Sequence, residues 1–169
     1  MKIDHLTGAA GACLLLLFAT STHAALIDNG NGLIYDQDRD ITWLMDANYA
    51  QTSGYDSDGL MTWSEANTWA DNLVYGGHSG WRLSPAEIPC NTAIGCSGVG
   101  GEMGHLYHAE LMGNTGTTTF DNIQNIYWTS TAYTGASEPA AWYYDFAGAT
   151  PGLQTWGFTS STTAAAWAV

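Results

Sequence analysis

One short segment, residues 80–85, constrains the fold more than any other part of this sequence. It reads Gly-Trp-Arg-Leu-Ser-Pro and contains one of only three basic residues in the chain of 169. Arg82 lies between a large aromatic and an aliphatic residue, where a charge is costly unless acidic or carbonyl groups pair with it. We therefore predict that Arg82 is a structural residue with such partners. Replacing it with alanine is expected to loosen or unfold the domain, at a cost of about 3–5 kcal/mol.

The first 24 residues have the features of a signal peptide. Lys2 lies in a short polar start, an apolar run follows, and small residues precede a cleavage position after Ala24. The apolar run is shorter than the roughly 20 residues that span a bilayer. We expect residues 1–24 to be removed on secretion, with no membrane insertion afterwards, and residues 25–169 to form one domain.

The charge balance excludes several classes of partner. The formal net charge is −13, and the only basic residues after the signal peptide are Arg39 and Arg82. This balance opposes binding to nucleic acid, anionic lipid or sulfated polysaccharide, and it permits divalent cations and neutral sugars. Aromatic residues make up 12% of the chain, more than the 11% that are charged, which argues against disorder.

Hydrophobic spacing predicts an α+β fold in which helices come between two groups of strands. Thr62 and Glu65 form a capping box at the start of one helix. The apolar stripe of that helix carries two tryptophans, and we interpret the stripe as core rather than as a sugar platform. Residues 102–112 predict a second helix, which ends at Gly113. Strand patterns occupy residues 33–36 and 41–44, which form a hairpin, and residues 127–131, 142–146, 153–159 and 164–169.

Two acidic turns contain the candidate calcium ligands. Asp36, Asp38 and Asp40 alternate in the hairpin turn, and Asp56 and Asp58 lie in a second turn. Calcium is bound by six to eight oxygen atoms, which such carboxylates can supply. The first turn lacks the glycine and the distal glutamate of an EF-hand, and a plain polar turn has the same pattern. We therefore assign no metal site, and calcium is the one cofactor that the sequence leaves open.

Cys90 and Cys96 are the only cysteines after the signal peptide, and in an exported protein they are expected to form a disulfide. The alternative is a zinc site that adds His105 and His108. The cysteine spacing is wider than in a zinc finger and export favours oxidation, so we favour the disulfide. Glu102, His105 and His108 also recur every three residues, which fits either a metal-binding flank of the second helix or a solvated surface.

Five motifs, in order along the chain, together resemble one known family: residues 32–36 with 41–44, 80–83, 102–107, 127–131 and 166–169. They are similar to the DUF1566 family, which includes the C-terminal domain of the Legionella collagen-like adhesin. The resemblance implies a C-type-lectin-like fold in a bacterial secreted or cell-surface protein, with paired terminal strands, two flanking helices and a ligand face of long loops. It also implies structural roles for Trp81, Arg82, Trp128 and Trp167.

The functional expectation that follows is a non-catalytic binding or adhesion module for an extracellular glycan or protein. Its loops at residues 48–59, 89–101 and 135–152 would face the ligand. The adhesin domain is associated with sulfated glycosaminoglycans, which require basic residues that this chain lacks. The lectin calcium motif is also incomplete, because Ala140 follows Glu138 and Pro139 where a third ligand is needed.

Two alternatives come from other functional classes. Formylglycine-generating enzymes also have a C-type-lectin-like fold and a cysteine pair, so an oxidoreductase of that kind would need Cys90 and Cys96 as reactive thiols. A structural protein of the envelope or matrix would have no discrete ligand. Members of the DUF1566 family often continue into a sorting anchor, so the resemblance also implies that this chain is a fragment or a freely secreted form.

Overall fold

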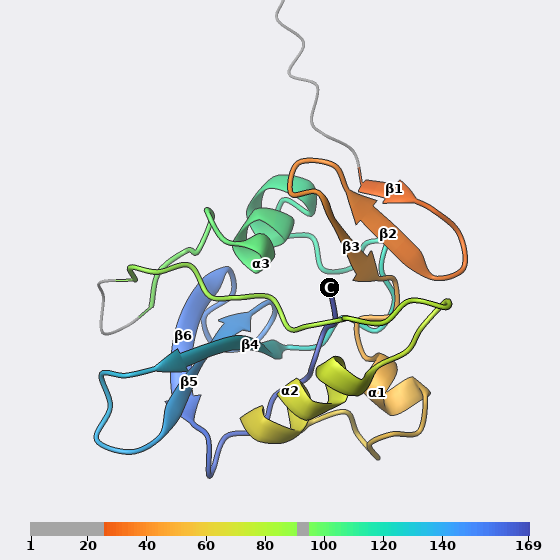
Figure 1. Cartoon of the computed structure of the whole chain (residues 1–169). Helices are drawn as coiled ribbons and strands as arrows, with labels where there is room; N and C mark the ends of the chain where they lie inside the picture. The colour runs from red at the N-terminus through yellow and green to blue at the C-terminus, as the bar shows by residue number, and fades with distance from the viewer. Residues whose placement is uncertain (1–25, 91–94) are drawn as a thin grey trace, which may run out of the picture.

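A computed structural model describes residues 26–90 and 95–169 as a mixed fold of two small antiparallel sheets and a few short helices (Figure 1). This arrangement agrees with the expected combination of helices and antiparallel strands. The predicted signal peptide lies outside the described residues. Within the described residues, no helix is long and apolar enough to cross a membrane.

The first sheet has the order β1-β2-β3, formed by Leu26–Asp28, Leu33–Asp36 and Ile41–Leu44. Strands β2 and β3 confirm the predicted hairpin. The Asp36 carboxylate closes its turn, because Oδ1 accepts the backbone N–H groups of Asp38 and Arg39 at 3.0 and 3.1 Å. Strand β1 was not predicted, since three residues are too few to show an alternating pattern.

The second sheet has the order β4-β5-β6, formed by Ile126–Tyr133, Ala140–Asp145 and Leu153–Phe158. All three strands were predicted from their aromatic and β-branched content. Residues 135–152 do not form the single ligand loop that we expected. Strand β5 occupies the centre of this segment and leaves a turn on each side of it. A register shift in β4 after Trp128 lets both ends of this strand pair with β5.

The helices are α1 at Tyr49–Thr52, α2 at Trp63–Asn72 and α3 at Glu102–His105. Helix α1 lies within a segment that we expected to be a loop. Helix α2 has the predicted capping box, and its stripe is core as expected, since Ala66, Trp69 and Ala70 are buried.

The predicted second helix is not a regular α-helix. Helix α3 continues into a π-helical segment, η1, at Leu106–Glu110, and the N–H of Leu111 donates to the carbonyl of Leu106 at 2.9 Å. A hydrogen bond across five residues widens the turn. The widened turn accompanies a contact between His105 and Glu110, which are also five residues apart.

The expected terminal strand at residues 164–169 is also corrected. The segment forms isolated bridges to three separate parts of the chain: Met61 with Ala164, Tyr127 with Ala165, and Leu83 with Ala168. The segment does not form a regular strand, because its pairing partner changes from one residue to the next. The chain ends between the two sheets (Figure 1). Trp167 is fully buried there and donates from Nε1 to the carbonyl of Leu44 at 2.8 Å.

Candidate functional site

Arg82 pairs with Glu102 at the start of α3. Its two terminal nitrogens donate to the two carboxylate oxygens at 2.8 and 2.6 Å, and one of them also lies 3.3 Å from the carbonyl of Leu83. The hydrogen bond to Glu102 raises the pKa of Arg82, against an opposing effect of partial burial. The expected acidic and carbonyl partners are therefore present. The Arg82 side chain is only partly buried, because 43% of it is exposed.

Arg39 is fixed at the same end of α3. Its guanidinium donates to the carbonyl of Gly100 at 2.8 Å and to that of Val99 at 3.1 Å. These two carbonyls lie just before the helix, whereas Arg39 lies in the turn between β2 and β3. Arg39 therefore connects the first hairpin to the start of α3.

Four of the five candidate calcium ligands make local hydrogen bonds, and those of Asp36 are the turn bonds described above. Asp56 Oδ1 accepts the N–H groups of Asp58 and Gly59. Both bonds lower the pKa of Asp56, and the bond from Asp58 has the larger effect. Asp58 Oδ1 accepts the N–H of Leu60, and Asp40 Oδ1 accepts the hydroxyl of Tyr35. Of the candidates, only Asp36 and Asp38 lie together in a cluster that includes residues from another element.

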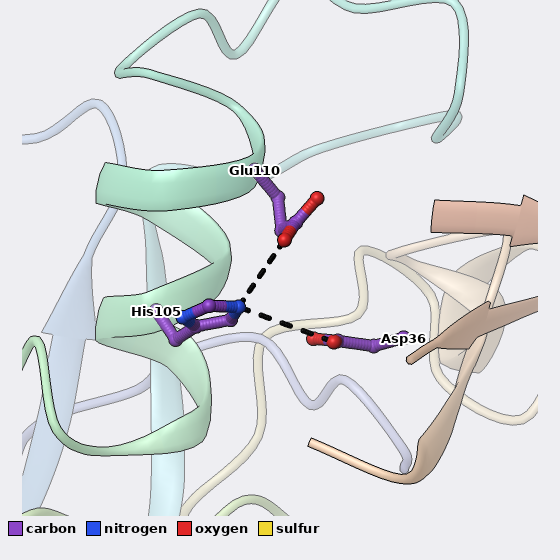
Figure 2. Close-up of side chains that lie close together, drawn as sticks. All are labelled: Asp36, His105 and Glu110. Carbon is purple, nitrogen blue, oxygen red and sulfur yellow. Dashed lines mark hydrogen bonds and ion pairs between the residues drawn. The ribbon is translucent and has the colours of Figure 1, made fainter. Parts of the chain in front are cut away.

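That cluster joins the end of β2 to α3 and η1. Figure 2 shows the carboxylates of Asp36 and Glu110 converging on the imidazole of His105. His105 Nε2 lies 3.2 Å from Glu110 Oε1 and 4.0 Å from Asp36 Oδ1. It also lies 3.6 Å from Oδ2 of Asp38, the most exposed of the four side chains. We refer to these four residues as the carboxylate–histidine cluster.

Burial is the largest influence on the pKa of Glu110. It raises the pKa of Glu110, and the charge of Asp36 adds to the effect, whereas His105 lowers it. Asp36 is fully buried, and its Oδ2 has no hydrogen-bond partner among the described residues. Sequence reasoning missed Glu110, because its five-residue spacing from His105 brings the two side chains together in a π-helical segment rather than in a regular α-helix.

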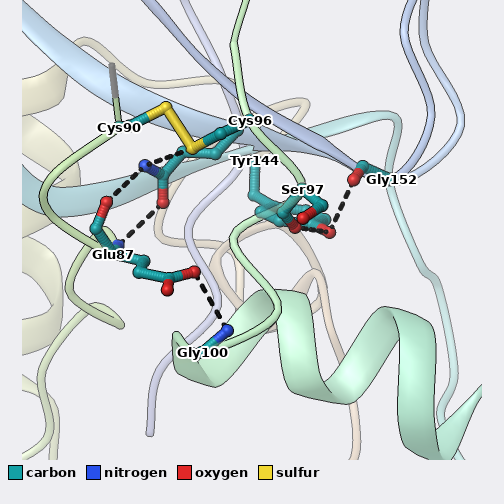
Figure 3. Close-up of a disulfide and its surroundings, with 8 residues drawn as sticks. Glu87, Cys90, Cys96, Ser97, Gly100, Tyr144 and Gly152 are labelled. Atoms are coloured by element: carbon teal, nitrogen blue, oxygen red, sulfur yellow. Dashed lines mark hydrogen bonds between the residues drawn. A yellow bond between two sulfur atoms is a disulfide. The ribbon is translucent and has the colours of Figure 1, made fainter. Parts of the chain in front are cut away.

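Cys90 and Cys96 form the predicted disulfide, with Cα atoms 5.8 Å apart (Figure 3). The other two residues of the alternative zinc site lie elsewhere. His105 belongs to the carboxylate–histidine cluster, and His108 Nε2 lies 2.9 Å from the carbonyl of Gly152. Glu102 pairs with Arg82, so the three residues of the proposed helix flank face three different partners.

The segment before the disulfide is held by Gln154 of β6. The Gln154 side chain accepts the N–H of Glu87 at 2.9 Å and donates to the carbonyl of Glu87 at 3.0 Å. The backbones of Gln154 and Cys96 exchange two further hydrogen bonds. Figure 3 also shows the Glu87 carboxylate accepting the N–H of Gly100. The disulfide is thus attached to the second sheet on one side and to the approach to α3 on the other.

An aromatic patch lies beside the disulfide. The Tyr133 and Trp156 rings are stacked, with centroids 4.8 Å apart and planes 16° apart. Trp142 and Phe158 contact these rings edge-on. Trp142 is buried, and the other three rings are partly exposed. A cavity of about 350 Å³ adjoins the patch and is lined by Ile88, Pro89, Cys90, Thr131, Ala132, Tyr133, Thr134 and Trp142.

The three tryptophans that were expected to have structural roles are all buried. Trp128 and Trp167 are fully buried, and Trp128 Nε1 donates to the carbonyl of Met61 at 2.8 Å. Trp81 is 7% exposed and donates from Nε1 to the carbonyl of His78. These three side chains belong to the core, away from the aromatic patch. No family model, curated protein or solved structure matches this chain.

Proposed function

We propose that this chain is an exported, non-catalytic binding module of the DUF1566 family with a C-type-lectin-like fold, and that the aromatic patch is its ligand surface. The observation that carries the proposal is a set of three partly exposed rings beside a cavity: Tyr133, which lines the cavity, stacks on Trp156, and Phe158 contacts Trp156 edge-on. Partly exposed apolar groups gathered in one place are typical of interaction surfaces. The motifs along the sequence support the family assignment.

The chemistry of the patch favours a neutral saccharide among extracellular ligands. Aromatic rings offer flat apolar faces on which the C–H faces of sugar rings pack, and the hydroxyl of Tyr133 adds a polar group. The net charge of −13 opposes acidic glycans. A protein ligand with an apolar surface is the other outcome that the patch allows.

The surroundings of the patch favour a pre-formed surface. Tyr133, Trp156 and Phe158 lie on paired strands, and Trp142 supports them from within the sheet. On the other side of the cavity, the disulfide and the Gln154 hydrogen bonds fix the backbone around Glu87 and Cys90. A rigid surface loses less conformational entropy on binding than a flexible loop does.

The test is binding to an array of neutral oligosaccharides, followed by titration of the best ligand by calorimetry with and without a chelator. We expect Trp156→Ala to weaken binding by at least about tenfold, because central aromatic residues carry much of the energy of an interface. The matched control is Tyr55→Ala, which removes an aromatic side chain that is 57% exposed in a different segment.

Two results would contradict the proposal. Absence of binding to any neutral glycan would remove the saccharide as ligand. A bound glycan whose affinity is the same for Trp156→Ala and for the unchanged protein would remove the aromatic patch as its site.

A further inference from the structure

We propose that Asp36, His105 and Glu110 bind one divalent transition-metal ion of the Zn²⁺ or Mn²⁺ type, with Asp38 as a fourth ligand. This site is separate from the aromatic patch and does not depend on the saccharide proposal. It would connect the hairpin of the first sheet to α3 and η1, which come from distant parts of the sequence.

The distances between donor atoms match those around a small cation. Ligand atoms bound to zinc at about 2.0–2.2 Å with tetrahedral angles lie about 3.4 Å from one another. In this cluster, His105 Nε2 lies 3.2 Å from Glu110, 3.6 Å from Asp38 and 4.0 Å from Asp36. The donor atoms of Asp36, His105 and Glu110 all lie within 4.8 Å of one another. An ion therefore needs only small side-chain movements to reach three or four ligands.

The buried Asp36 carboxylate is an independent indication of a cation. Its side chain is 1% exposed and points toward His105 (Figure 2). Its Oδ2 has no hydrogen-bond partner among the described residues, whereas Oδ1 is engaged by the N–H groups of the turn. A buried ionised oxygen without a partner is costly, and a metal ion would satisfy it.

The charge balance of the cluster also favours a cation. Asp36, Asp38 and Glu110 can carry three negative charges, and His105 supplies at most one positive charge. The neighbouring Arg39 directs its guanidinium to the carbonyls of Val99 and Gly100. A doubly charged cation would neutralise the negative charge that remains after His105 has supplied its single positive charge.

The type of donor indicates the type of ion. One imidazole nitrogen and two or three carboxylate oxygens suit zinc and manganese, whereas calcium prefers six to eight oxygen ligands. The N–H groups of the turn orient the Asp36 carboxylate, as the outer partners of metal ligands do. Asp38 is 47% exposed and gives the ion a path from solvent.

Zinc titration of the chelator-treated, oxidised protein tests the proposal. Calorimetry and native mass spectrometry should find one Zn²⁺ per chain, with Ca²⁺ binding at least about tenfold more weakly. Because an ion that binds only the folded state stabilises it, free Zn²⁺ at about 100 times its Kd should raise the Tm by about 5–10 °C. Keeping the protein oxidised prevents Cys90 and Cys96 from acting as zinc ligands.

Variants then separate this site from zinc bound elsewhere. His105→Gln and Glu110→Gln should each lower the affinity for Zn²⁺ by at least about tenfold, in protein whose circular dichroism spectrum is unchanged. His78→Gln and Asp71→Asn replace an exposed histidine and an exposed carboxylate outside the cluster and should leave the affinity unchanged. The proposal is overturned by the absence of saturable zinc binding, by binding that neither cluster variant weakens, or by tighter binding of calcium than of zinc.

Discussion

At the scale of single residues, the two arginines that follow the predicted signal peptide both stabilise the start of α3. Arg39 donates to the carbonyls of Val99 and Gly100, and Arg82 pairs with the carboxylate of Glu102. Arg39 therefore holds the backbone just before α3 from the hairpin, and Arg82 holds the first residue of α3 from the segment after α2. Neither guanidinium is directed at the aromatic patch, which agrees with a ligand that carries no negative charge.

Arg82→Ala is expected to lower the free energy of unfolding by about 1–2 kcal/mol. The substitution leaves the Glu102 carboxylate, whose side chain is only 16% exposed, without its charged partner. The cost is smaller than the 3–5 kcal/mol expected for a buried pair, because solvent reaches 43% of the Arg82 side chain and weakens the interaction. Urea denaturation of the two single variants Arg82→Ala and Glu102→Gln, and of the double variant, measures the coupling. Strictly additive effects would show that the pair contributes nothing.

The sequence identified the kind of partner that Arg82 requires but neither the partner itself nor the degree of burial. A charge beside apolar residues must find an acceptor, and that requirement is local. The choice of Glu102 depends on how the segment after α2 meets α3, which no short pattern contains. The same limit applies to the carboxylate–histidine cluster, because Asp36 and Glu110 come together only in the folded chain.

At the scale of elements, the sequence predicted those helices and strands that are stabilised by interactions within a short segment. The hairpin of β2 and β3 has its own turn hydrogen bonds from Asp36, and α2 has the capping box of Thr62 and Glu65. The π-helical segment and the irregular C-terminal segment were not predicted, because both depend on contacts with other elements. Disulfide formation was predictable from the pair of cysteines and the expected export, whereas the role of Gln154 in holding the adjoining backbone was not.

Reducing the disulfide is expected to destabilise the protein without unfolding it. Cys90 and Cys96 are six positions apart, and closing so short a loop stabilises the folded state by about 2 kcal/mol. The double variant Cys90→Ser with Cys96→Ser should therefore have a Tm about 5 °C lower in a thermal melt. Removing both cysteines together avoids leaving one free thiol.

The same cysteines distinguish the binding module from the oxidoreductase alternative. In protein purified without a reductant, thiol labelling under native conditions should modify neither cysteine until a reductant is added. Two reactive thiols before reduction would contradict the disulfide as the resting state and would favour an enzyme.

At the scale of the whole molecule, residues 164–169 connect the parts of the fold. Their backbone pairs with the segment before α2, with β4 and with the segment that contains Arg82. Trp167 contacts the rings of Trp43 in β3 and Tyr127 in β4, and also those of Phe120, which precedes β4, and Phe146, which follows β5. The six residues after Thr163 therefore hold together elements that are distant in sequence.

Trp167→Ala and Trp156→Ala are expected to separate stability from binding. Trp167 is fully buried, so truncating it removes ring contacts, opens a cavity and leaves the Leu44 carbonyl without its donor, at a cost of about 3–5 kcal/mol. That is a large share of the roughly 5–15 kcal/mol that stabilises a typical domain. Trp156 is partly exposed, so its truncation should cost much less in a urea titration followed by circular dichroism, while it weakens binding to the saccharide. Equal losses of stability in the two variants would show that the aromatic patch belongs to the core and is not a pre-formed binding surface.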